Sequence, residues 1–289
     1  MVEYILGNYL VKNGKITTEQ LNDTLTKQDS VRVKLGLIAV AEGMMTLEQT
    51  DEVNRLQAVM DQRFGDIAVS KGYLTDEQIG KLLKKQGNSY LMFIQTLVDS
   101  GYVTMEDVDT LVNNFRQAND YSNSELEDLK SDDVDRIIPL FIPEEGKQYT
   151  DVIATTVRTL IRLIDRHVYI GQAAMVDALP TADLVSQALS GDNGIIDCFS
   201  EGDGALLKVC SVFGREEFPQ LDLDSLDAAG EFLNCINGLY ASSLSSQGRF
   251  LELMPPCYED VNAQVKSNIC QIPIYIGDKT LYFTVAEQV

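Results

Sequence analysis

The chain has 289 residues, of which 45% are hydrophobic and 23% charged, a balance typical of globular domains that excludes disordered and collagen-like chains. At roughly 150 residues per domain, this length predicts two domains, each able to bury a core of its own. The 44 acidic and 23 basic residues give a formal net charge of -21, which argues against a surface that binds nucleic acid or anionic lipid. We expect a cytoplasmic protein, because no apolar run approaches the ~18 residues of a membrane span.

The cysteine and histidine content limits the chemistry that the chain can perform. The single histidine, His167, excludes a Ser-His-Asp hydrolase triad and a metal site built from several histidines. The cysteines form no CxxC pair, so the sequence indicates neither a disulfide framework nor a zinc site, and we expect them to be small buried side chains. They are Cys198, Cys210, Cys235, Cys257 and Cys270.

Residues 1–118 contain four copies of a 29-residue unit. Each unit predicts a short helix closed by a glycine in the left-handed conformation, then a second helix capped by threonine. Gln follows the Thr by three residues in three copies and completes a capping box, whereas Asp107 stands there in the fourth. Because each helix pair needs neighbours to bury its apolar face, we expect the four pairs to form one all-α domain. The copies share Gly14, Gly43, Gly72 and Gly101, Thr17, Thr46, Thr75 and Thr104, and Glu19, Glu48, Glu77 and Glu106.

This repeat also resembles a known domain. The run LGLIAVAEGMMTLEQTDEVNRLQ from Leu35, with its Leu-Gly pair, paired apolar residues and final Gln, is similar to the N-terminal domain of type II secretion and pilus-assembly ATPases. That domain binds cyclic di-GMP in some members, and an Arg precedes its Leu-Gly pair. Here only Arg63 does so, while Ile5, Lys34 and Met92 occupy the equivalent positions. We expect a structural or protein-docking role, with cyclic di-GMP binding and docking to a secretion or motility assembly as alternatives.

The range 119–147 differs in composition from the sequence before it. It holds nine Asp or Glu against three Lys or Arg and begins with the polar run NDYSNSELEDLKSDD. Such a composition predicts an acidic linker, which has room for a short helix.

The range 148–289 alternates between helical and strand-like patterns, in the same order twice. The helical stretch 150–166 precedes the strand-like run 167–176, a segment around 184–189, and two further β-rich runs, GIIDCF and ALLKVCSVF. The order then recurs as the helix 226–244, the strand 249–254, and the runs ICQIPIYI and TLYFTV, which the hairpin signal Gly277-Asp278 joins.

A single constant offset superposes these halves. It places Asp151 on Asp227, Pro180 on Pro256, and the runs GIIDCF and ALLKV on CQIPIYI and LYFTV. We therefore predict a duplicated α-β-x-β-β unit in an α+β fold, with an antiparallel sheet covered by the two long helices.

The helix 226–244 has an apolar stripe and an opposite polar face. The stripe, which we expect to face the sheet, comprises Ala229, Phe232, Leu233, Ile236, Leu239 and Tyr240. On the opposite face, beside Asp227 and Gly238, Glu231 and Asn234 are three residues apart and project side by side. A carboxylate there can hold a Lys or Arg of a partner, and a carboxamide can orient a water molecule.

The pattern Asp227-xxx-Glu231-xx-Asn234, followed after 21 residues by Pro256, resembles the signature of the CheC, CheX and FliY chemotaxis phosphatases, over residues 148–289. In that family the Glu pairs with a Lys of a phosphorylated response-regulator receiver domain, and the Asn positions the water that attacks the aspartyl phosphate. The resemblance therefore implies that Glu231 docks the receiver and that Asn234 is catalytic. Asp227 and Pro256 would shape the ends of the helix and the strand.

This chemistry requires no base and no cofactor on the chain itself. An acyl phosphate is already activated, and the receiver is expected to bring its own Mg²⁺, acidic pocket and Lys, so the missing element is a water held in line. In the first copy Thr155 and Arg158 replace the Glu and Asn, which leaves one active helix, as in CheX, and implies a homodimer by analogy. The alternative is a non-catalytic adaptor that binds a receiver through one half and a protein partner or cyclic di-GMP through the other.

Overall fold

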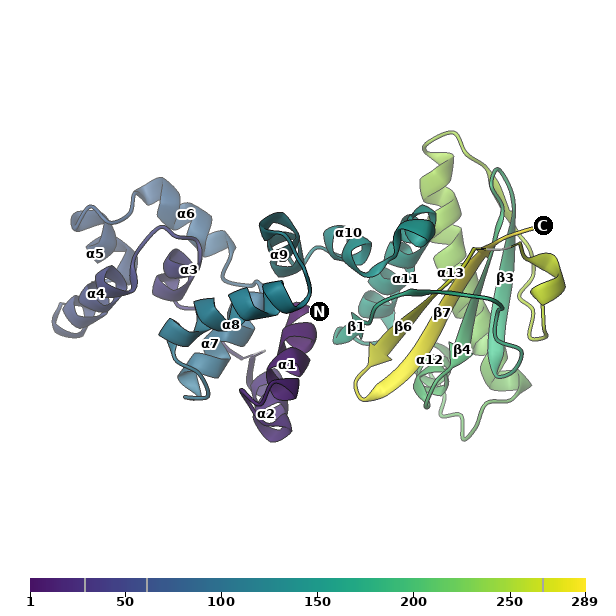
Figure 1. Ribbon diagram of the computed structural model, residues 1–289, viewed down its shortest axis with the longest axis horizontal. Helices are drawn as coiled ribbons and strands as arrows, with labels where there is room; N and C mark the ends of the chain where they lie inside the picture. Colours follow the sequence, from purple (N-terminus) through teal and green to yellow (C-terminus); the bar gives the residue numbers. More distant parts are fainter. Residues whose placement is uncertain (29, 61, 267) are drawn as a thin grey trace. The chain divides into compact units, whose positions relative to one another are not determined.

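The computed structural model describes residues 1–28, 30–60, 62–266 and 268–289 (Figure 1). The chain divides into two compact units, Val2–Asp132 and Asp133–Val289. In the described ranges, no helix combines the length and the hydropathy needed to cross a bilayer.

The first unit consists of helices joined by short turns. The sequence turns the chain where a glycine adopts positive φ, such as Gly43 at 63°, and starts the next helix at a threonine. Thr46, Thr75 and Thr104 each form a complete capping box, the last with Asp107, so the predicted caps are confirmed and the fourth copy is not an exception. The helices are α1 (Val2–Lys12), α2 (Thr18–Gln28), α3 (Leu35–Ala41), α4 (Leu47–Val59), α5 (Phe64–Ser70), α6 (Asp76–Lys84), α7 (Ser89–Asp99), α8 (Met105–Ala118) and α9 (Asn123–Lys130).

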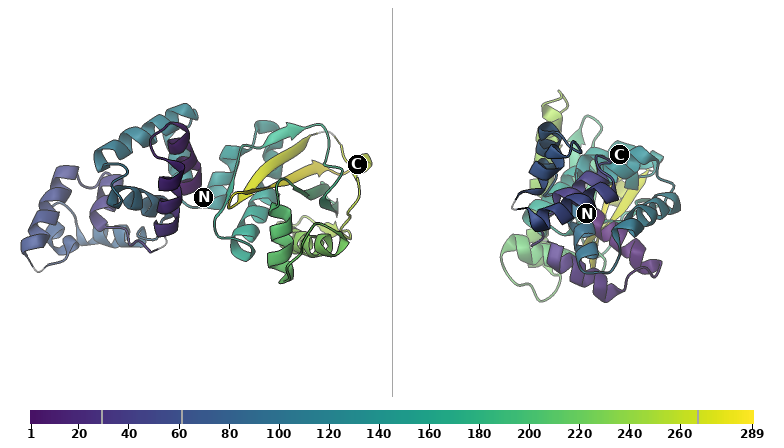
Figure 2. Two further views of the ribbon diagram at one scale, coloured as in Figure 1. Left: turned by 90° about the horizontal axis from the view of Figure 1, so that it is seen from below. Right: turned by 90° about the vertical axis from the view of Figure 1, so that its left-hand side faces the viewer.

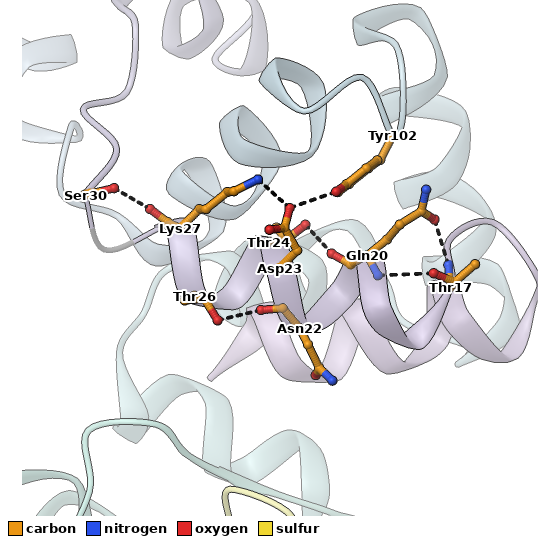
Figure 3. A network of polar contacts seen from close by, with 9 residues as sticks. All are labelled: Thr17, Gln20, Asn22, Asp23, Thr24, Thr26, Lys27, Ser30 and Tyr102. Carbon is orange, nitrogen blue, oxygen red and sulfur yellow. Dashed lines mark hydrogen bonds and ion pairs between the residues drawn. The ribbon is translucent and has the colours of Figure 1, made fainter.

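A polar contact joins the first and fourth helix pairs (Figure 3). The Tyr102 hydroxyl, in the turn after α7, donates to Asp23 Oδ2 on α2 over 2.7 Å, and Lys27 Nζ reaches the same oxygen at 2.7 Å. Hydrogen bonds from Lys27 and then Tyr102 hold the pKa of Asp23 below its usual value. Residues 79 positions apart in the sequence are therefore in direct contact.

The range expected as an acidic linker contains helices and buried apolar side chains. In the first unit it carries α9, and in the second it carries α10 (Val134–Ile137) and the 3₁₀ helices η1 (Ile138–Phe141) and η2 (Glu144–Tyr149). The division between the two units lies inside this range. The buried apolar residues of the range are Tyr121, Leu126, Leu129, Ile137, Ile138, Phe141 and Ile142.

The second unit is built on an antiparallel sheet, as predicted. The strands follow the order β1-β6-β7-β4-β3-β5, and β2 also pairs with β6. Gly277 has a φ of 70° in the β6–β7 hairpin, where the sequence predicts a two-residue turn. The strands are β1 (Val168–Ile170), β2 (Ala174–Val176), β3 (Leu184–Gly191), β4 (Ile195–Glu201), β5 (Leu251–Leu253), β6 (Ile269–Ile276) and β7 (Lys279–Glu287).

Helices cover one face of this sheet, and loops cover the other. The long helices α11 (Thr150–Leu163) and α13 (Leu223–Ser245) lie along the first face (Figures 1 and 2). There Phe232 of α13 stacks on Phe199 of β4, with ring centroids 6.1 Å apart. On the other face, Leu179 and Val261 from loops pack against alternate residues of the strands. Side chains of one strand therefore enter two different cores.

The run ALLKVCSVF is helical, so its prediction as a strand is wrong. It forms α12 (Ala205–Gly214), whose buried residues Ala205, Leu206, Val209 and Cys210 recur with the period of a helix. The Glu201 carboxylate accepts hydrogen bonds from the backbone N–H groups of Ala205 and Leu207, at 3.1 and 3.3 Å. This cap satisfies donors that the first turn of a helix leaves open, and it comes from the end of the preceding strand.

The strand order is symmetric between the two halves, but the offset that places Asp151 on Asp227 is wrong for the strands. Exchanging β1 with β5, β3 with β6, and β4 with β7 reproduces the same strand order, and Phe199 lies opposite Phe283 at the centre of the sheet. The matched strands start at 168 and 251, at 184 and 269, and at 195 and 279, so the members of each pair are further apart than Asp151 and Asp227. Because α13 has 23 residues and α11 has 14, helix and strand positions cannot share one offset.

Candidate functional site

Helix α13 presents the predicted polar face. Its start is fixed by Asp222 and Ser225, which form a reciprocal capping box, so Asp222 rather than Asp227 shapes the end of the helix. The apolar stripe is buried except for Leu239, which lies at its edge and is 40% exposed. The polar residue Asn237, at the other edge of the stripe, is fully buried. The face opposite the stripe carries Asp227, Glu231, Asn234 and Gly238, all exposed as expected.

Glu231 offers an open negative charge on this face. Among the described residues, its carboxylate has no ion pair and no hydrogen bond, although the chain forms ion pairs elsewhere on its surface. The charge is also felt locally, since Glu231 is one of the neighbours that raise the pKa of Tyr258. The side chain is therefore available to a cation of a partner.

Asn234 is held from the sheet side. Gln187 of β3, which is 1% exposed, donates from Nε2 to Asn234 Oδ1 over 2.8 Å and to the backbone oxygen of Met254 over 2.7 Å. The oxygen of Asn234 thus points inward, while its Nδ2 has no partner within the described ranges. An exposed amide fixed in this way has less rotational freedom to lose when it orients a reactant.

The polar contacts continue into the core. Asn237 Nδ2 donates to Gln187 Oε1 and to Asp197 Oδ1, each over 2.9 Å. Asn237 and Asp197 are fully buried, and burial raises the pKa of Asp197 to about 7, against the opposing effect of the bond from Asn237. Gln187 and Asp197 are paired across β3 and β4, which places both side chains on the helix-covered face.

The Asp227 and Pro256 positions of the motif are joined through Tyr258. The Tyr258 hydroxyl donates to Asp227 Oδ1 over 3.0 Å. Burial and the nearby carboxylates of Asp227 and Glu231 raise the Tyr258 pKa to about 12, so the hydroxyl remains protonated. A Cβ at Gly230 would lie 2.9 Å from the Tyr258 hydroxyl and 3.1 Å from Pro256 Cβ. The segment after β5 therefore lies directly against α13, beside the exposed face.

Helix α11 carries no comparable pair. Thr155 is buried and its hydroxyl donates to the backbone oxygen of Asp151 over 2.8 Å. Arg158 donates to Thr155 Oγ1 over 3.0 Å and pairs with Asp135. The first copy thus lacks both the open carboxylate and the anchored amide, as the sequence indicates.

Four residues of this region were not singled out by the sequence. Gln187, Asp197, Asn237 and Tyr258 hold the motif from behind or from the side. Only Asp197 could have been found from the sequence. It interrupts the apolar run GIIDCF at a position whose neighbours on the same face of the strand are buried. Across the described ranges, no group of three or more His, Cys, Asp or Glu side chains has the arrangement of a metal site.

No family model and no curated protein sequence matches this chain. Its structure is similar, over about half its length, to solved structures of CheX and CheC-like chemotaxis proteins. CheX of Desulfovibrio desulfuricans is 14% identical, with a TM-score of 0.41, and the match covers 49% of this chain and 99% of that one. CheX of Vibrio vulnificus is 13% identical, with a TM-score of 0.39 and coverages of 47% and 95%.

A third similar structure is CheX of Borrelia burgdorferi, solved in a complex with CheY, BeF3 and Mg²⁺. It is 16% identical, with a TM-score of 0.40, and the match covers 47% of this chain and 94% of that one. The resemblance of residues 1–118 to secretion and pilus-assembly ATPases stays a prediction.

Proposed function

We propose that the unit Asp133–Val289 is a phosphatase that removes the aspartyl phosphate from a response-regulator receiver domain. One observation carries the proposal: Glu231, an unpaired carboxylate, and Asn234, an amide anchored from below, lie three residues apart on the exposed face of α13. These are the residue types and the spacing of the CheC, CheX and FliY signature.

The proposed reaction is the in-line hydrolysis of an acyl phosphate. A water oxygen bonds to phosphorus as the bond from phosphorus to the aspartyl oxygen breaks, which yields inorganic phosphate and a free aspartate. The proton of the water passes to a phosphoryl oxygen, so no base is needed on this chain. Asn234 acts by position, because Gln187 holds its amide in one orientation. The receiver supplies its own Mg²⁺.

Glu231 would fix the receiver relative to Asn234. An exposed carboxylate can pair with a lysine at the phosphorylation site of the receiver, and the spacing on the helix brings the amide to the same place. The two residues therefore have separable effects, one on binding of the receiver and one on the rate of hydrolysis in the complex.

The test is loss of phosphate from a phosphorylated chemotaxis receiver mixed with the full chain. Wild type should accelerate the loss, Asn234→Ala should abolish the acceleration with binding retained, and Glu231→Gln should weaken binding by about 1.5–3 kcal/mol, the value of a charged hydrogen bond. Ser242→Ala, an exposed change on the same helix, should behave as wild type. If wild type binds the receiver but leaves its rate of phosphate loss unchanged, the phosphatase proposal is wrong and the non-catalytic adaptor is favoured.

For the first unit we propose a docking role, with cyclic di-GMP as the alternative ligand. Arg63 stands before α5, exposed and without a partner among the residues described, whereas Lys34 at the equivalent position before α3 pairs with Asp99 over 2.7 Å. Arg63 is therefore the basic group of this register that is open to a ligand. Calorimetry with cyclic di-GMP on wild type and Arg63→Ala tests the nucleotide, and the absence of heat at micromolar ligand would favour docking.

A further inference from the structure

The amide of Asn234 has a direction, and Gln187 sets it. An exposed asparagine can place either its oxygen or its NH2 group outward, and the two arrangements offer opposite hydrogen-bonding chemistry. Here Gln187 Nε2 lies 2.8 Å from Asn234 Oδ1 and 2.7 Å from the backbone oxygen of Met254.

The backbone oxygen of Met254 determines which amide atoms donate and which accept in the contacts of Gln187 and Asn234. A carbonyl can only accept, so Gln187 must present its NH2 group to Met254. The same NH2 group faces Asn234, so the Asn234 atom that accepts its hydrogen bond must be the oxygen. The NH2 group of Asn234 is then the part that faces outward, toward a docked partner.

Gln187 is itself held at its other end. Its Oε1 accepts from Asn237 Nδ2 over 2.9 Å, and that nitrogen also donates to Asp197 Oδ1 over 2.9 Å. Gln187, Asn237 and Asp197 are each no more than 1% exposed, so water does not compete for these bonds. Rotating the Gln187 amide by half a turn would set its oxygen against the Met254 oxygen and its NH2 group against that of Asn237.

We propose that Gln187 is a positioning residue for the dephosphorylation reaction, which it serves by fixing Asn234 with its NH2 group toward the receiver. This inference rests on the proposed function. Asn234 then donates from Nδ2 to a phosphoryl oxygen or to the oxygen of the attacking water. Without Gln187 both arrangements of the amide would be populated, and the side chain would have to be ordered during each reaction.

The kinetic test is Gln187→Met, which keeps the length of the side chain and removes both ends of the bridge. We expect kcat to fall on the order of 10-fold, with KM for the phosphorylated receiver unchanged within about twofold. Ser186→Ala, a buried polar change at the preceding position of β3, should leave kcat as in wild type.

A structural readout separates the inference from the proposed function. In nuclear magnetic resonance of the ¹⁵N-labelled full chain, the side-chain NH2 of Asn234 should show a heteronuclear NOE like that of ordered backbone, and that of exposed Asn193 should be lower. In Gln187→Met the value for Asn234 should fall to that of Asn193.

Each outcome has one meaning. Wild type that accelerates dephosphorylation, with Gln187→Met equal to it, overturns the positioning role and leaves the phosphatase intact. Wild type without activity removes the phosphatase, and the inference falls with it, although an ordered Asn234 amide would still show that Gln187 holds this side chain. If circular dichroism shows that Gln187→Met does not fold, the heteronuclear NOE of the wild-type protein is the test. An Asn234 amide as mobile as that of Asn193 would then overturn the inference.

Discussion

Asp197 is a carboxyl group in the middle of an apolar sheet, 0% exposed, and its only partner among the described residues is Asn237. Its second oxygen, Oδ2, has no hydrogen-bond partner among the described residues, so the charged form is poorly compensated. Burial raises the pKa of Asp197 to about 7. The protein therefore carries a group that changes charge near neutral pH inside its core.

This group predicts that the contribution of Asp197 to stability falls as pH rises from about 4 to 7. In that window the folded state keeps a proton on Asp197 that the unfolded chain, with its pKa near 3.8, has released, so raising the pH favours unfolding. The loss is on the order of a few kcal/mol and persists above pH 7. Asp197→Asn, which resembles a permanently protonated residue, should be more stable than wild type at pH 8 and equal to it at pH 4.

Urea unfolding at pH 4, 6 and 8 measures this difference. Asp278→Asn, at an exposed turn position, is the matched control and should leave the pH profile of wild type unchanged. A profile of Asp197→Asn parallel to that of wild type would show that Asp197 stays ionised throughout.

At the scale of single residues, the sequence predicted the exposed positions and missed what holds them. Helical spacing is enough to place Glu231 and Asn234 together on a solvated face, because only local geometry decides it. Asn234 is instead held by Gln187 of β3, which precedes it by 47 positions, and Gln187 is fixed in turn by Met254 in the segment after β5. Such contacts depend on strand pairing, which no local pattern specifies.

At the scale of elements, α13 contains two glycines with opposite surroundings. A Cβ at Gly230 would meet Tyr258 and Pro256 at 2.9 and 3.1 Å, whereas a Cβ at Gly238 would meet no atom of the described residues within 4 Å apart from the backbone of its own helix. Both lie in the interior of the helix. The pair therefore separates the intrinsic preference of a helix for alanine from the packing of α13 against the segment after β5.

We expect Gly238→Ala to raise the free energy of unfolding by about 0.5–1 kcal/mol, the difference in helix propensity. Gly230→Ala should instead lower it below wild type, since Tyr258 must move and give up its bond to Asp227. Urea titration of the three proteins is the measurement. An equal rise in the free energy of unfolding in both variants would mean that the segment after β5 can move away from α13 without loss of stability.

Helix α12 shows where element prediction fails. Its nine-residue apolar run is short enough for either a strand or a buried helix, and periodicity alone does not separate them. The structure chooses the helix because Gly204, at a φ of 101°, turns the chain and Glu201 caps the first turn. Both signals lie before the run, in what the sequence presents as the end of a strand and a turn.

At the scale of the whole molecule, the chain is two units with their own cores, and the boundary lies after Asp132. The helices α10 and η1 pack on α11 and bury Ile137, Ile138 and Phe141. The backbone oxygen of Phe141 also accepts a hydrogen bond from the N–H of Ala173 over 2.8 Å. The residues before 148 thus contribute to the second unit.

Two fragments test this boundary. The fragment 133–289 should melt cooperatively, whereas 148–289 should melt at a lower temperature or fail to fold, because each large apolar side chain removed from a core is worth about 1.5–3 kcal/mol. Circular dichroism against temperature is sufficient to compare them. Equal melting temperatures would show that α10 and η1 contribute nothing to the second core.

Whole-molecule organisation was predictable where it repeats. Self-similarity located the glycines and threonines of the first unit, and the hairpins of the second predicted an antiparallel sheet. The single offset between the two halves failed because the two long helices differ in length, and a constant offset cannot absorb an insertion within one copy. The exchange symmetry of the strands becomes visible only from their pairing.

The Met254 carbonyl that orders the site belongs to the backbone, and this has a consequence for mutational tolerance. Every amino acid supplies that oxygen, and the Met254 side chain is 42% exposed, so any residue except proline can replace Met254 without turning the amide of Asn234. The oxygen is placed by the pairing of this segment with β3, where the Met254 N–H donates to Ala188 over 2.9 Å. A change of strand register, and no change of side chain at 254, is what would reverse the amide.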